Sequence, residues 1–148
     1  MSSSVGTLQG TLPVRTEEDI VASRQKVRAL TQQLKFSLVD QTKMITAASE
    51  LSRNALVYGG GGEMRWQTVT NGVKRGLRLH FEDTGPGIAD VQLALTDGWT
   101  SGGGMGLGLP GSKRLVHEFD LQSTPGRGTH VSITRRKGSR GTDQRQRS

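Results

Sequence analysis

The stretch Glu82-Asp-Thr-Gly-Pro-Gly-Ile-Ala-Asp-Val91 places one carboxylate, that of Asp83, directly before a glycine turn. The segment that leads into it, residues 75–82, alternates polar residues with the apolar residues Leu77, Leu79 and Phe81. This period of two predicts a half-buried strand that ends at the edge of a core. Asp83 is therefore expected to be a partly buried acceptor that can bind the exocyclic amine of a nucleotide base.

Composition limits the chain to one compact unit. With 148 residues, of which 32% are hydrophobic, it supports a single domain that buries about two-thirds of its unfolded surface. The absence of cysteine excludes disulfides and thiolate metal sites, and the three histidines, His80, His117 and His130, show no spacing typical of metal ligands. Because the N-terminus lacks a signal-peptide pattern and no apolar run approaches ~18 residues, the protein is expected in the cytoplasm.

The net charge of +7 is concentrated at the C-terminal end. Residues 135–148 carry six basic residues against Asp143, which leaves +5 there and +2 in the rest of the chain. This segment has no apolar residue, so residues 136–148 are expected to be a disordered basic tail. An electrostatic arm for an acidic partner, including nucleic acid, is a weaker alternative, and it predicts strongly salt-dependent binding.

The hydrophobic periodicity predicts an α+β fold. The expected elements are a strand at 11–15, helices from Thr16 to about Lys35 and from Asp40 to the glycine run 59–62, strands at 64–70 and 75–82 joined at Asn71-Gly72, a short helix at 90–96, a helix at 111–119, and strands at 121–124 and 129–135. Strands outside any alternating β-α-β pattern favour a two-layer α/β sandwich with a mixed, mainly antiparallel sheet. Residues 1–10 are expected to be disordered and residues 11–135 to form the domain.

A second block, Ser101-Gly-Gly-Gly-Met-Gly-Leu-Gly-Leu-Pro-Gly-Ser-Lys113, is dense in glycine. Successive glycines let backbone N–H groups approach phosphate oxygens, and a helix that starts just after them adds partial positive charge. Gly106 to Gly111 satisfies the dinucleotide pattern G-x-G-x-x-G, but no strand precedes it and little chain follows. A P-loop is excluded because the order is Gly-Ser-Lys and not Gly-Lys-Ser/Thr. The block can therefore cradle a triphosphate, and a flexible linker is the alternative interpretation.

A third block lies on the second expected helix, in Ser49-Glu-Leu-Ser-Arg-Asn-Ala55. Glu50 and Asn54 are four residues apart, so both project from one helical face. A carboxylate beside an amide can orient a hydroxyl group and can supply oxygen ligands to Mg²⁺.

Together, the three blocks resemble the ATP-binding domain shared by gyrase, histidine kinases, MutL and the Hsp90 chaperone, the GHKL or Bergerat fold. The order and separation of the N box at 50–54, the glycine boxes at 83–87 and 126–129 and the glycine lid at 102–108 are similar to that domain. Within this superfamily, the run 49–54 and the segments 97–103 and 108–115 resemble the anti-sigma-type serine/threonine kinases, in particular the switch kinases of the bacterial stressosome.

The resemblance implies a role for each matching residue. Glu50 is expected to be the general base, and Asn54 to hold Mg²⁺ against the phosphates of ATP. Asp83 is expected to accept from the adenine amine, with Thr129 nearby through a water. The remaining nucleotide-binding residues are expected to be Gly85 and Gly87 at the base, and Gly102, Gly103, Gly104, Gly106, Leu107 and Gly108 in the lid. Lys113 or Arg114 could neutralise the γ-phosphate.

The resemblance also implies a function. The expected activity is Mg-ATP-dependent phosphorylation of serine or threonine in STAS-domain antagonist or scaffold proteins, within a partner-switching stress pathway. Release from that scaffold would free the kinase to activate a PP2C-type phosphatase. The alternative is an anti-sigma factor or nucleotide-gated binding protein that sequesters a sigma factor, and a homodimer is compatible with either function.

Overall fold

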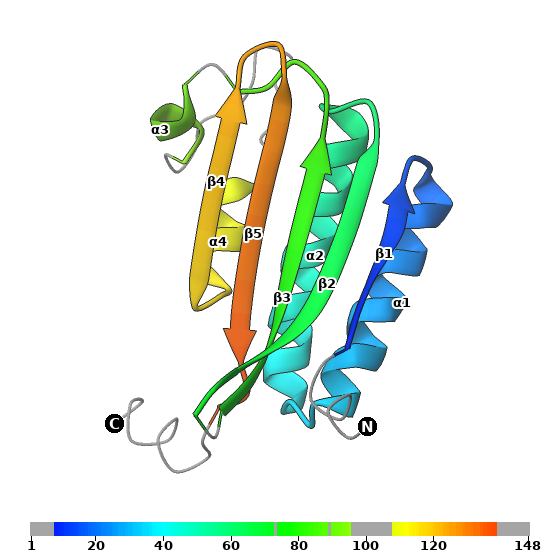
Figure 1. Cartoon of the computed structure of the whole chain (residues 1–148), viewed down its shortest axis with the longest axis vertical. Helices are drawn as coiled ribbons and strands as arrows, with labels where there is room; N and C mark the ends of the chain where they lie inside the picture. Colours follow the sequence, from blue (N-terminus) through cyan, green and yellow to red (C-terminus); the bar gives the residue numbers. More distant parts are fainter. Residues whose placement is uncertain (1–7, 73, 89, 96–107, 139–148) are drawn as a thin grey trace.

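The computed structural model describes residues 8–72, 74–88, 90–95 and 108–138. Five strands form one sheet in the order β1-β2-β3-β5-β4, and helices cover one of its faces (Figure 1). The elements are β1 (Gln9–Val14), α1 (Glu17–Gln33), α2 (Leu38–Val57), β2 (Gly62–Asn71), β3 (Lys74–Asp83), α3 (Val91–Ala94), α4 (Leu109–Arg114), β4 (Glu118–Thr124) and β5 (Gly128–Arg136). The predicted two-layer α+β sandwich is confirmed. All four strand pairings are antiparallel, so the described part of the sheet is not mixed.

Side-chain caps fix where the two long helices begin. Thr16 forms a capping box with Asp19, as its side chain accepts from the Asp19 N–H at 3.1 Å while the Asp19 carboxylate accepts from the Thr16 N–H. The second helix begins at Leu38 and not at Asp40, because Ser37 is its N-cap and accepts from the Asp40 N–H. No helix in the described part of the chain combines the length and hydrophobicity needed to cross a bilayer.

The core lies between the sheet and the helices α1 and α2. Leu77, Leu79 and Phe81 point to this side from β3, as their alternation predicted, and each is at most 2% exposed. The apolar stripes of the helices meet them, with Val27 and Leu51 almost completely buried. This packing fixes α2, which carries Glu50 and Asn54, against the middle of the sheet.

Both predicted hairpins are present. Asn71, which was expected in the first turn, pairs with Lys74 and is the last residue of β2. Thr124 pairs with Gly128 across the turn at residues 125–127. These registers place Met64 opposite Phe81 and Leu121 opposite Val131, on the helix-covered face.

The helix predicted for residues 111–119 is wrong at both ends. Helix α4 begins at Leu109, within the glycine-dense block, and it ends at Arg114. The residues after it alternate, with Phe119 half-buried between exposed neighbours in β4. Pairing with β5 overrides the local helical pattern there, because it buries Phe119 opposite Ile133.

The predicted domain boundaries also move outward. Gln9 and Gly10 pair with β2, so these two residues belong to the sheet and not to a disordered N-terminus. Arg136 is the last residue of β5 and donates to the Glu118 carboxylate at 2.7 Å. The rest of both predicted terminal segments, residues 1–7 and 139–148, lies outside the described residues.

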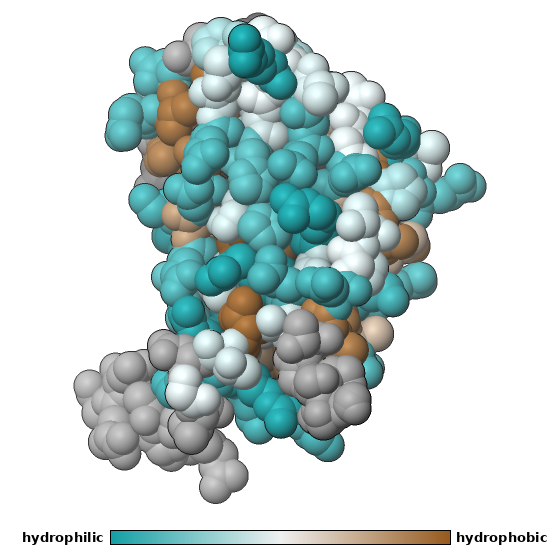
Figure 2. All heavy atoms as spheres, in the orientation of Figure 1, coloured by the Kyte–Doolittle hydropathy of each residue, from teal (hydrophilic) through white to brown (hydrophobic). Residues whose placement is uncertain are grey.

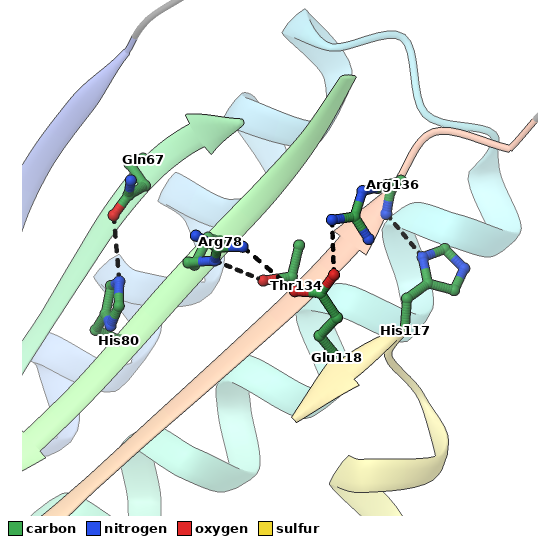
Figure 3. A network of polar contacts seen from close by, with 7 residues as sticks. All are labelled: Gln67, Arg78, His80, His117, Glu118, Thr134 and Arg136. Carbon is green, nitrogen blue, oxygen red and sulfur yellow. Dashed lines mark hydrogen bonds and ion pairs between the residues drawn. The ribbon is translucent and has the colours of Figure 1, made fainter. Parts of the chain in front are cut away.

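The other face of the sheet carries no helix and is mostly hydrophilic, as Figure 2 shows from that side. Polar contacts run across its strands (Figure 3): Arg78 donates to Thr134 Oγ1 at 2.8 Å and pairs with Glu118 at 3.3 Å. The hydrogen bond from Arg136, together with the nearby guanidinium groups, lowers the pKa of Glu118. These pairs are typical of a solvated sheet face that discourages non-specific association.

Two histidines meet on this face although their spacing in the sequence gave no sign of it. His80 Nδ1 lies 3.0 Å from His130 Nε2, and the two ring planes differ by 9°. The ring centroids are 5.2 Å apart, so the rings meet edge to edge through one N–H···N bond and are not stacked. Burial and the nearby Arg65 lower the pKa of His80, which favours the neutral ring that such a bond requires.

Candidate active site at the ends of β3 and α2

Asp83 ends β3 on the helix-covered face and is half-buried there. Its Oδ1 accepts from the Gly85 N–H at 3.0 Å, and the Thr129 N–H also donates to this carboxylate. Burial raises the pKa of Asp83, and the two backbone donors oppose that rise. The carboxylate therefore has two fixed donors and remains partly open to a third.

A close glycine contact holds Asp83 in this position. Gly59, at the end of α2, lies so near that a Cβ atom there would be 2.3 Å from the Asp83 Cγ. A Cβ at Gly85 would in turn be 2.6 Å from the Gly59 Cα. The run 59–62 predicted the end of a helix, and nothing in the sequence indicated that Gly59 lies against Asp83.

Glu50 and Asn54 lie one turn apart on α2, as predicted. Glu50 is exposed and Asn54 is half-buried. Gly108 lies directly against Glu50, because a Cβ atom at Gly108 would be 2.5 Å from the Glu50 Oε1. Gly108 has a φ of 67°, in the left-handed region that glycine adopts at little cost. The helix carboxylate and the last residue of the expected lid are thus brought together.

The rest of the expected lid lies outside the described residues: Gly102, Gly103, Gly104, Gly106 and Leu107. Gly87 belongs to the same turn as Gly85 and is half-buried. Lys113 and Arg114 are exposed in the last turn of α4, away from the end that contacts Glu50.

Thr129 is the direct cross-strand partner of Asp83, so it lies on the same face of the sheet. Its hydroxyl is 2.9 Å from the hydroxyl of Ser123, a β4 residue that also accepts from the Ile88 N–H at 2.6 Å. Ser123 was not predicted as a site residue. No local pattern marks it, since a serine in a strand is ordinarily only a polar position.

The donor set matches a nucleotide with Mg²⁺ better than a protein-bound metal. Among the described residues, no group of three His, Cys, Asp or Glu side chains could hold an ion. Mg²⁺ is commonly held by one or two protein oxygens, with substrate phosphates and water completing its shell. Asn54 and Glu50 offer such oxygens on one helix face, and the absence of a side chain at residues 59, 85 and 108 lets the backbone pack directly against Asp83, Gly59 and Glu50, respectively.

Comparison with known proteins shows which family the chain belongs to. Residues 39–138 match the family model of the histidine kinase-, DNA gyrase B-, and HSP90-like ATPases. The serine/threonine-protein kinase RsbT of Bacillus subtilis (strain 168) is 45% identical over 123 residues, which cover 83% of this chain and 92% of that protein. The anti-sigma F factor of Thermoanaerobacter sp. (strain X514) is 28% identical over 79% of this chain and 85% of its own length.

The fold is also found in a solved structure. The RsbU and RsbW domains of Rv1364c from Mycobacterium tuberculosis superpose on 90% of this chain with a TM-score of 0.61 at 19% identity. This chain spans about a third of that structure's length, 33%, so the likeness concerns the fold alone. From the matched residues 39–138 and the extent of the similarity to RsbT, the chain belongs to the family of histidine kinase-, DNA gyrase B-, and HSP90-like ATPases.

Proposed function

We propose that this protein is a serine/threonine protein kinase of a partner-switching pathway. The observation that carries the proposal is the placement of Glu50 and Asn54 on one face of α2, with Gly108 against Glu50 and Asp83 at the neighbouring end of β3. Similarity to RsbT over most of the chain supports the activity. A base, a metal ligand and a nucleotide acceptor are the groups that phosphoryl transfer requires from a protein.

Each residue has a role in the proposed reaction. Glu50 accepts the proton of the attacking hydroxyl as that oxygen bonds to the γ-phosphorus of ATP, while the bond from the γ-phosphorus to the bridging oxygen breaks and ADP leaves. Asn54 would hold Mg²⁺, which would neutralise charge on the phosphates. Asp83 accepts from the adenine amine, with Thr129 beside it. The predicted lid glycines, residues 102–108, cover the phosphates and exclude water.

The partners follow from the resemblance to the stressosome kinases. The substrates are STAS-domain antagonist or scaffold proteins, and release from the scaffold frees the kinase to activate a PP2C-type phosphatase. The proposed location is the cytoplasm, where such proteins and ATP meet. A homodimer is compatible with this function.

A second function is favoured by the anti-sigma F factor relatives at 28% identity. In that function, the protein sequesters a sigma factor and nucleotide binding shapes the surface that does so. The two functions predict different behaviour of a Glu50→Gln variant. Partner control by sequestration survives the substitution, whereas control by phosphorylation is lost.

Transfer of the γ-phosphoryl group tests the proposal. The STAS-domain proteins of the source organism are incubated with this protein and Mg-ATP labelled at the γ-phosphate, and the label is followed on each protein. We expect one STAS protein to gain label on serine or threonine. If no STAS protein gains label while a sigma factor is retained in a nucleotide-dependent complex, the second function replaces the first.

The pKa of Asp83 predicts how ATP affinity changes with pH. The ionised carboxylate accepts from an amine more strongly than the protonated carboxyl group does, and burial raises the pKa of Asp83, so affinity should fall in mildly acidic solution, above the ordinary titration range of aspartate. The stability of the empty protein changes in the opposite direction, since the contribution of a raised carboxyl pKa is full below the unfolded value and is lost as pH rises through the folded value.

Calorimetric titration with ATP across this pH range measures the effect. A Glu63→Gln variant is the matched control, because Glu63 is an exposed carboxylate on β2 that should leave the profile unchanged. ATP affinity that stays constant down to the pH of unfolding would refute the role of Asp83 as acceptor.

A Gly108→Ala variant should lose transfer activity while it keeps most of its nucleotide affinity. The added Cβ would lie 2.5 Å from Glu50 Oε1 and push the carboxylate away. A shift of about 1 Å in a reacting group can lower a rate about 100-fold. Single-turnover transfer rates measure the loss.

Gly60→Ala is the control for this variant. Gly60 has a similar φ of 73°, and a Cβ there would meet nothing within 4 Å. Both variants therefore carry the same backbone penalty, but only one displaces Glu50. Equal transfer rates in the two variants would show that contact with Glu50 is irrelevant.

A further inference from the structure

The hydroxyl of Ser123 connects three segments that surround Asp83. It accepts from the Ile88 N–H at 2.6 Å, lies 3.2 Å from the Gly128 carbonyl oxygen, to which it donates, and lies 2.9 Å from Thr129 Oγ1. Ser123 is half-buried in β4, on the helix-covered face of the sheet, where it pairs directly with Thr129. The hydroxyl thus joins the turn after Asp83 to the β4–β5 hairpin.

A second bond joins the same two segments. The Gly126 N–H in the hairpin donates to the Pro86 carbonyl at 2.8 Å. With the Ile88 bond, it fixes the turn at residues 84–88 to the hairpin at two points. The position of Asp83 relative to Thr129 is therefore set by contacts on both sides of the site.

The number of protons decides the direction of each bond. A serine hydroxyl has one proton to donate and two lone pairs that accept. All three contacts of Ser123 are satisfied at once only if its proton goes to the Gly128 carbonyl. The Ile88 N–H and the Thr129 O–H then both donate to Ser123 Oγ. The hydroxyl proton of Thr129 is then engaged in the hydrogen bond to Ser123, so Thr129 Oγ1 can only accept a further hydrogen bond.

We propose that Ser123 is a positioning residue that sets base selection, by holding the Thr129 hydroxyl as an acceptor beside the Asp83 carboxylate. The inference rests on the proposed function, in which this end of the site takes the purine of ATP. Two acceptors match the 6-amino group of adenine, which donates. They repel the 6-oxo group of guanine, which accepts. Ser123 need not touch the base for this selection.

Replacement of Ser123 by alanine releases the Thr129 proton. The threonine hydroxyl can then rotate and donate to the O6 atom of guanine, so ATP and GTP should be bound more equally. The Ile88 N–H also loses its acceptor, which should weaken the affinity for ATP. Because a lost or mismatched buried hydrogen bond changes a binding constant by about tenfold, the ratio of ATP to GTP affinity should fall about tenfold.

The experiment measures binding of ATP and GTP with Mg²⁺ by calorimetry, in slightly alkaline solution, for wild type, Ser123→Ala and Ser123→Thr. Ser123→Thr keeps the hydroxyl and should restore the selectivity of the wild type. Ser132→Ala is the matched control, because Ser132 is a half-buried β5 serine on the opposite face of the sheet. In the transfer reaction, Ser123→Ala should raise the KM for ATP and leave kcat unchanged.

The outcomes separate the inference from the function on which it rests. A wild-type protein that binds neither nucleotide overturns both. A wild type that binds ATP in preference to GTP, beside a folded Ser123→Ala variant with the same preference, overturns the inference alone. If Ser123 only stabilises the fold, Ser123→Ala should lower the melting temperature and reduce the affinities for ATP and GTP by the same factor. That result would also overturn the inference.

Discussion

Arg135→Met is expected to destabilise the folded protein by about 3–5 kcal/mol, because it leaves a buried carboxylate without its partner. The guanidinium donates through Nε and Nη2 to Asp40 Oδ1, and through Nη1 to the Leu115 carbonyl at 2.9 Å. The side chains of Arg135 and Asp40 are only 12% and 8% exposed. One side chain of β5 therefore ties the start of α2 to the end of α4.

Urea unfolding measures the change, and two further variants interpret it. Arg136→Met removes the neighbouring arginine, whose partner Glu118 is half exposed, so its cost should stay below about 1 kcal/mol. The double variant Arg135→Met/Asp40→Leu should regain much of the loss, because an apolar pair replaces the buried charges. If Arg135→Met lowers the free energy of unfolding no more than Arg136→Met does, the buried pair does not stabilise the contact between β5 and the start of α2.

Glu50→Gln is expected to lower the rate of phosphoryl transfer by about 10²–10⁴ while ATP still binds, because glutamine keeps the shape of the side chain but cannot accept a proton. Glu50 is exposed on α2 and lies against Gly108, so the substitution should leave the core unchanged. Single-turnover kinetics with a STAS-domain substrate, beside calorimetric ATP binding, separate the two effects.

Glu63→Gln serves again as the control, since it removes an exposed carboxylate from the sheet and should leave the rate unchanged. A Glu50→Gln variant that loses ATP affinity in proportion to its rate would assign Glu50 to nucleotide binding. A variant with the full wild-type rate would exclude Glu50 as the base.

Local patterns in the sequence predicted the parts of the fold that local interactions decide. The alternation of Leu77, Leu79 and Phe81 predicted a strand buried on one side, and the structure buries all three. Thr16 before three acidic residues predicted the start of α1, and it forms a capping box there. The spacing of Glu50 and Asn54 placed them on one helix face, because four residues make about one helical turn.

The errors arose where partners distant in the sequence decide the structure. Asp40 has the side chain of a good N-cap, but Ser37 takes that role and the Asp40 carboxylate pairs with Arg135, 95 residues away. Arg135 in turn looked like the start of a charged tail. Residues 115–119 have a helical pattern, yet Phe119 joins a strand because β5 offers it a partner.

Two residues that surround Asp83 were not predicted for the same reason. Gly59 is one glycine in a run of four, and only its distance to Asp83 shows why a side chain is excluded there. Ser123 has no motif of its own, and its importance comes from three bonds to residues in other segments. Such contacts depend on the register of the sheet, which no single local pattern reveals.

Intact-mass spectrometry of a STAS-domain partner, after incubation with Mg-ATP and either wild type or Glu50→Gln, determines whether this protein is a kinase that uses Glu50 as its base. Both proteins are first shown to bind ATP with similar affinity. We expect the partner to gain the mass of one phosphate with the wild type and none with the variant. A partner that stays unmodified with ATP-bound wild type, or that is modified equally by both proteins, would contradict a kinase in which Glu50 is the base.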